Sequence, residues 1–154
     1  MVYDILTKIK DHLEANEQVN TVTFGDILDV DLNKQSIFPL SHIMLGNAVV
    51  SRQYVSFTIS VMAMDVADIS KDNPRDEAEP FYGVSNEQDI LNTQFYVIND
   101  LVMAMTKGDL FTDKFQVDGN PTAQPFMDRY ENVLVGWAVD MTINVPNTIS
   151  ICQD

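Results

Sequence analysis

Two long stretches of the chain alternate between apolar and other residues with almost no error. Between Tyr54 and Asp65, one side collects Val55, Phe57, Ile59, Val61 and Ala63. In the second stretch, one side collects Val133, Val135, Trp137, Val139, Met141, Ile143 and Val145. Successive side chains of a strand point to opposite faces of a sheet. Each stretch therefore predicts a long strand with one apolar face and one mixed face.

Helical spacing of apolar residues predicts two helices. Over residues 2–16 the repeating positions are Ile5, Leu6, Ile9 and Leu13. A broader stripe follows Ser85 and consists of Ile90, Leu91, Gln94, Val97, Ile98, Leu101, Val102 and Met105. Ser85 with Gln88 forms a capping-box pattern, and Gly108 is expected to end the second helix. A stripe this broad indicates a helix that covers a sheet face.

Shorter segments that favour strands complete the predicted sheet. They predict strands at residues 21–24, 41–50, 115–117 and 148–152. Residues 41–50 precede a polar turn and are expected to pair with the strand that starts at Tyr54. Residues 26–39 are expected to form an ordered loop along the sheet. Pro121 and Pro125 indicate an irregular segment or an edge strand, because proline cannot donate to a ladder.

The order of these elements predicts a single α+β domain over residues 1–154. It is a mainly antiparallel twisted sheet with two helices packed on one face. The most polar segment lies at about residues 66–84, where acidic residues greatly outnumber basic ones and Pro74 and Pro80 bar regular structure. We expect an exposed acidic loop or arm there, long enough to require a function.

Composition narrows the class of protein. With 45% apolar residues the 154-residue chain is able to bury a core. The net charge is −14, and nine basic residues are scattered without a cluster, so direct binding to nucleic acid is not expected. The acidity favours either simple solubility or a surface that lies beside nucleic acid without adhering to it. Neither a signal peptide nor a membrane span is expected, because no long uninterrupted apolar stretch occurs.

Candidate catalytic and metal-binding residues are sparse. His12 lies near the end of a predicted helix, where it complements the helix dipole, and His42 is expected to be a packed or edge histidine. Cys152 has no activating base nearby, and the acidic residues at 26–31 lack the glycine and glutamate of a calcium loop. No nucleophile elbow or phosphate loop occurs. We therefore expect no enzyme activity, no cofactor and no metal site.

The mixed face of the first long strand is the best indication of an interface. Tyr54, Met62 and Met64 share the face opposite Phe57. A strand with apolar residues on both faces is expected to be covered on both sides. A helix would cover one face, and a neighbouring subunit is the candidate for the other.

Three segments carry a resemblance to a known family. They are FPLSHIMLGNAVV at 38–50, VSFTISVMAMDVAD at 55–68 and YENVLVGWAVDMTINVPN at 130–147. With the order of elements, they make the chain resemble the tail-terminator or tail-completion proteins of tailed bacteriophages. These proteins act at the neck, or head–tail joint. The resemblance rests on layout over most of the chain rather than on a diagnostic motif.

The resemblance implies a viral structural protein that forms a homohexameric ring in the virion. Such a ring ends growth of the tail tube and joins the tail to neck and connector proteins, and DNA passes through it without specific binding. Assembly would take place in the host cytoplasm. Expected subunit contacts are Tyr54, Met62 and Met64 on the strands, with Asp72, Asp76 and Glu77 on the acidic arm. The alternatives are another neck or tail-tube ring protein of the same plan, or a small cytosolic binding module.

Overall fold

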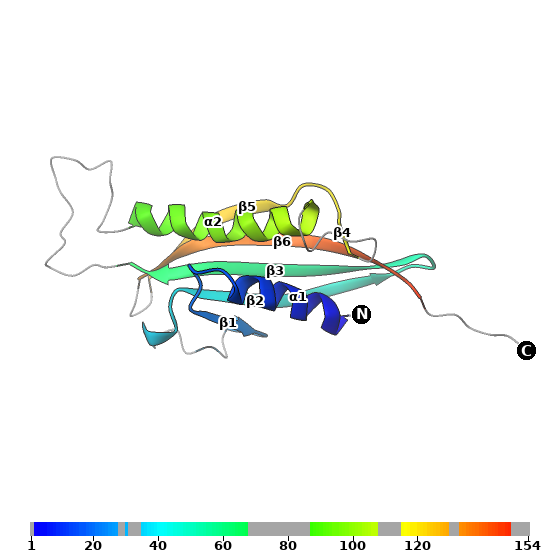
Figure 1. Cartoon of the computed structure of the whole chain (residues 1–154), viewed down its shortest axis with the longest axis horizontal. Helices are drawn as coiled ribbons and strands as arrows, with labels where there is room; N and C mark the ends of the chain where they lie inside the picture. Colours follow the sequence, from blue (N-terminus) through cyan, green and yellow to red (C-terminus); the bar gives the residue numbers. More distant parts are fainter. Residues whose placement is uncertain are drawn as a thin grey trace, which may run out of the picture.

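The computed structural model describes residues 2–27, 30, 35–67, 87–107, 115–129 and 133–148. Two α-helices, a short 3-10 helix at Gln35–Ile37 and six strands make up the described fold (Figure 1). The α-helices are α1 (Val2–Glu14) and α2 (Glu87–Thr106). The strands are β1 (Thr21–Phe24), β2 (Leu40–Val50), β3 (Tyr54–Val66), β4 (Gln116–Val117), β5 (Thr122–Arg129) and β6 (Val133–Pro146).

The strands form one sheet in the order β1-β2-β3-β6-β4, and β5 also pairs with β6. The central pair, β3 and β6, is antiparallel without interruption from Tyr54 opposite Pro146 to Val66 opposite Leu134. The predicted hairpin of β2 and β3 is present, with an irregularity between Leu45 and Ala48. The α+β class and the mainly antiparallel sheet are thus confirmed. The parallel pairing of β1 with β2 was not predicted.

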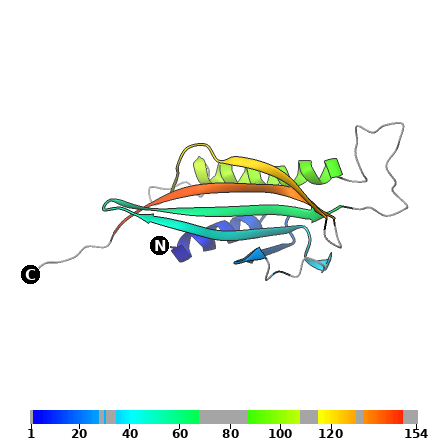
Figure 2. The same ribbon diagram turned by 180° about the vertical axis from the view of Figure 1, so that it is seen from behind.

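Both helices cover the same face of the sheet, as predicted (Figures 1 and 2). The core between them joins Ile5, Ile9 and Leu13 of α1, Val97, Ile98, Leu101 and Met105 of α2, and the alternate apolar residues of β3 and β6. The apolar faces of the two alternating stretches thus both point at the helices. Burial of this apolar area is the main stabilising contribution to the fold.

The edge formed by β4 and β5 behaves as one interrupted strand. Val117 pairs with Ile143 and Thr122 with Asp140, so residues 118–121 form an irregular connection along β6. Gly119 within it has a φ of 65°, a conformation that favours glycine. The prediction of an irregular or edge segment around Pro125 is confirmed as an edge strand, since β5 pairs with β6 alone among the described strands.

Gly136 permits a close approach between β3 and β6. It lies opposite Met64, and a Cβ at this position would overlap the carbonyl oxygen of Ala63. A side chain here would force the two longest strands apart. The glycine is therefore a requirement of the central pair rather than of a turn.

Several sequence predictions fall outside the described residues. They are the capping box at Ser85, the helix stop at Gly108, the acidic arm beyond Ala67 and the strand beyond Thr148.

Candidate functional site

The sheet face opposite the helices, which Figure 2 shows toward the viewer, is here called the open face. It carries a ladder of hydroxyl and amide groups. On β3 and β6, Ser56 donates a hydrogen bond to the Asn144 Oδ1 at 2.6 Å, and Ser60 donates to the Asp140 carboxylate. Cross-strand pairs of this kind stabilise a sheet without needing a second layer over it. These polar side chains on the open face therefore satisfy one another's hydrogen bonds.

Charge is scarce on the long strands. Among the residues of β2, β3 and β6, the carboxylates are Asp65 and Asp140, and there is no lysine or arginine. Asp65 lies opposite Val135 on the helix-covered face, which leaves Asp140 on the open face. The chain as a whole has a net charge of −14, so the open face of β2, β3 and β6 carries unusually little charge.

One end of the open face is covered by the chain itself. Leu40, Met64 and Leu134 form a buried cluster there, and the residues packed against it include Ile27, Val30, Ile37 and Phe38. These last residues belong to the segment 26–39, which was predicted to lie along the sheet. Its described residues confirm that prediction. The segment supplies the second apolar layer that the mixed face of β3 requires.

This cover corrects part of the predicted subunit interface. Met64 is 1% exposed, so it has no surface to offer a neighbour, and the prediction for it is wrong. Met62 packs against the same cluster as a partly buried side chain. Tyr54 lies at the other end of the strand, is 45% exposed and stays a candidate contact. The predicted contacts Asp72, Asp76 and Glu77 lie outside the described residues.

His42 is a structural histidine. Its Nε2 donates a hydrogen bond to the Gly25 carbonyl at 2.7 Å, so the neutral ring accepts one from the Thr23 hydroxyl at Nδ1, also at 2.7 Å. Burial lowers the pKa of His42, against the raising influence of the Gly25 bond and the Asp26 charge. The ring thus fastens β1 to β2, which fits the prediction of a packed histidine.

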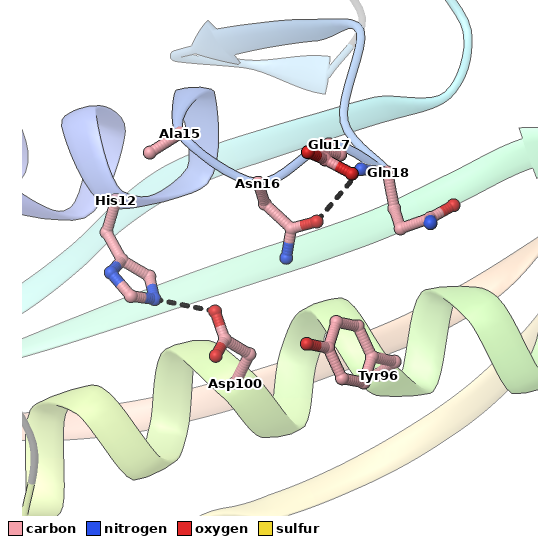
Figure 3. Close-up of a pocket in the computed structure, with 7 residues that line it drawn as sticks. All are labelled: His12, Ala15, Asn16, Glu17, Gln18, Tyr96 and Asp100. Carbon is pink, nitrogen blue, oxygen red and sulfur yellow. Dashed lines mark hydrogen bonds and ion pairs between the residues drawn. The ribbon is translucent and has the colours of Figure 1, made fainter.

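His12 lies in the last turn of α1, the position predicted for it, and it also makes a contact that was not predicted. Its Nε2 lies 2.8 Å from an Asp100 carboxylate oxygen, and so joins α1 to α2 (Figure 3). The pair lies in a hollow of about 390 Å³, which Tyr96 of α2 and residues 15–18 also line. The two partners are 88 positions apart, so no local sequence signal identifies the pair. The hollow is one candidate for a small-molecule site.

Metal-ligating side chains do not cluster in the described part of the chain. No group of three or more histidine, cysteine, aspartate or glutamate residues is arranged to hold an ion there. Burial raises the pKa of Asp65, although the Val66 amide donates a hydrogen bond to it at 2.7 Å.

The β5 edge is guarded against pairing with another chain. Pro125 removes one backbone donor from it.

Beside this edge, Phe95 of α2 packs edge-on against Trp137, with ring centroids 5.1 Å apart. The Trp137 Nε1 donates to the Leu91 carbonyl at 2.8 Å, which fixes the ring. This corner of the molecule joins α2 to the sheet.

Comparison with protein-family models gives no match, and comparison with curated proteins gives none. No helix in the described residues is long and apolar enough to cross a membrane.

Proposed function

We propose that the chain is a non-enzymatic virion protein that assembles into a ring at the head–tail joint of a tailed bacteriophage. The observation that carries the proposal is the open face, a long antiparallel surface that is nearly free of charge in a chain of net charge −14. The α+β plan fits the tail-terminator resemblance of the sequence. The ring would end the tail tube and dock it to neck proteins.

The composition of the open face also fits a wall past which DNA slides. Binding to DNA depends on lysine and arginine that neutralise phosphates. β2, β3 and β6 carry no lysine or arginine, and their open face presents hydroxyl and amide groups with one carboxylate, Asp140. Such a wall would neither hold DNA nor strongly repel it. In this proposal the helices, with most of the described charges, face away from the channel.

A direct test is the size of the purified protein and its place in the virion. Mass photometry is expected to detect a closed species, with six copies of the 17.4 kDa chain as the proposed number. Labelled antibody is expected to mark the junction between head and tail in electron micrographs of virions. A protein that stays monomeric at high concentration and is missing from virions contradicts the proposal.

A small binding module is the second candidate. The hollow that contains His12, Tyr96 and Asp100 favours it, because polar groups converge there from two helices. A screen of small polar compounds by thermal shift tests this candidate. A hit that stabilises the wild-type chain but not a Tyr96→Ala variant would support it.

A further inference from the structure

The hollow between α1 and α2 is lined by two carboxylates and by none of the described lysine and arginine side chains. The lining consists of His12, Ala15, Asn16, Glu17, Gln18, Tyr96 and Asp100. The carboxylates are those of Glu17 and Asp100. In a chain of net charge −14, such a lining repels an anion and attracts a cation.

Two segments of the chain bring these groups together. Tyr96 and Asp100 are four positions apart on α2, so they lie on one face of the helix. On the other side, after the end of α1, the Gln18 amide donates a hydrogen bond to the Asn16 Oδ1 at 2.9 Å. Figure 3 shows the Asn16 side chain turned toward α2 and the Tyr96 hydroxyl turned toward Asp100. The polar groups of the two segments thus converge on one hollow.

Three of the oxygen acceptors in the hollow are available to a ligand. Asp100 uses Oδ2 for its contact with the His12 Nε2, which leaves Oδ1. The Glu17 carboxylate and the Tyr96 hydroxyl make no hydrogen bond or ion pair with other residues that the structure describes. A primary ammonium group carries three N–H donors and no acceptor, so it matches a set of three acceptors.

The size and the apolar part of the lining restrict the rest of the ligand. The volume of about 390 Å³ is near the lower end of the range for ligand pockets, which is about 300–1,000 Å³. Ala15 and the ring of Tyr96 are the apolar surfaces of the lining, and Tyr96 is 59% exposed. An aromatic ring face also attracts a cation. A short alkyl chain next to the ammonium group fits these surfaces.

We propose that the hollow binds a small primary alkylammonium ion. The Glu17 and Asp100 carboxylates hold the ammonium group, and the alkyl part lies against Tyr96 and Ala15. The inference does not depend on the proposed ring, so its failure leaves the ring standing. It names the ligand class for the hollow that favours the second candidate function. Hydrogen bonds between charged partners distinguish this site from the general attraction of cations to an acidic surface.

Titration with butylammonium chloride, followed by NMR of the ¹⁵N-labelled chain, tests the site. Sodium chloride is exchanged for butylammonium chloride at constant total salt, because any salt screens the charge of the chain. The backbone amide signals of Glu17, Tyr96 and Asp100 are expected to shift along a saturating curve. Tetramethylammonium, which has the charge without the N–H donors, is expected to bind more weakly. Linear shifts without saturation, or equal affinity for butyrate, would overturn the proposal.

Two substitutions that each remove one negative charge locate the cation. Glu17→Gln is expected to weaken butylammonium binding about threefold, the scale of a single solvent-exposed ion pair. Asp118→Asn, between β4 and β5, is the matched control and should leave the affinity unchanged. Both side chains are exposed, so both variants should keep the native amide spectrum. Equal weakening by the two substitutions, or weakening by neither, contradicts binding in the hollow.

Discussion

Gln94 provides the sharpest test of how α2 packs on the sheet. It is 1% exposed, and neither Oε1 nor Nε2 has a hydrogen-bond partner among the described residues. Its helix neighbours Val97 and Ile98 belong to the main core. A buried polar group without a partner costs about 1–3 kcal/mol in the free energy of unfolding. The amide is therefore a source of instability within the core.

Replacement of Gln94 by methionine removes the polar atoms while it keeps the length and approximate volume of the side chain. Glutamine and methionine have nearly equal helix propensities, so the helix itself is not affected. We expect Gln94→Met to raise the free energy of unfolding by about 1–3 kcal/mol. The midpoint of thermal unfolding should rise by roughly 2–4 °C for each kcal/mol.

Urea unfolding followed by tryptophan fluorescence measures this change. Trp137 is the single tryptophan of the chain, and its bond to the Leu91 carbonyl makes it a reporter of α2 docking. Gln18→Met, at an exposed position, is the control and should leave the midpoint unchanged. If Gln94→Met lowers the free energy of unfolding by 1 kcal/mol or more, the amide is satisfied after all, for example by a buried water, and the argument is refuted.

Four further substitutions test other parts of the fold. His42 has a lowered pKa in the folded state, so the unfolded chain binds its proton first. Urea midpoints should therefore fall as the pH drops below about 6.5, and fall less in a His42→Gln variant. Asp65 has a raised pKa, so its ionisation destabilises the fold above that pKa. Asp65→Asn should be more stable than wild type at pH 7, with the advantage lost in acid. Gly136→Ala should cost about 3 kcal/mol or more, because its Cβ would overlap the Ala63 carbonyl oxygen, whereas Gly46→Ala should cost much less.

The strands and helices could be predicted closely because their apolar periods are long. β3 was predicted to begin at Tyr54, and it does so. The boundary of α1 was less exact, since the last residue is Glu14 rather than Asn16. Helix ends are set by individual capping bonds, and a period does not encode them. The parallel pairing of β1 had no local signal, because it depends on the buried His42 ring and its two partners.

The predicted interface failed where it depended on contacts from distant segments. Alternation correctly placed Met62 and Met64 on the face opposite Phe57. It does not identify which segment covers that face, and here residues of 26–39 cover one end of it. The exposed apolar residues lie at the other end of the same strands, around Val49 and Val50. In the sequence, Val49 and Val50 look like an ordinary apolar continuation of β2. Only their exposed fraction in the structure distinguishes them from core residues.

The distribution of charge connects the fold with the proposed assembly. In the described residues, the acidic side chains lie mainly on α1, on α2 and in the turns, while β2, β3 and β6 carry two. The helix-covered faces of these strands carry little charge because they form the core, so the open face alone bears on assembly. A chain of net charge −14 repels its own copies, and that repulsion is screened beyond about 8 Å at physiological salt. The low charge of the open face is the part of this distribution that favours the proposed assembly.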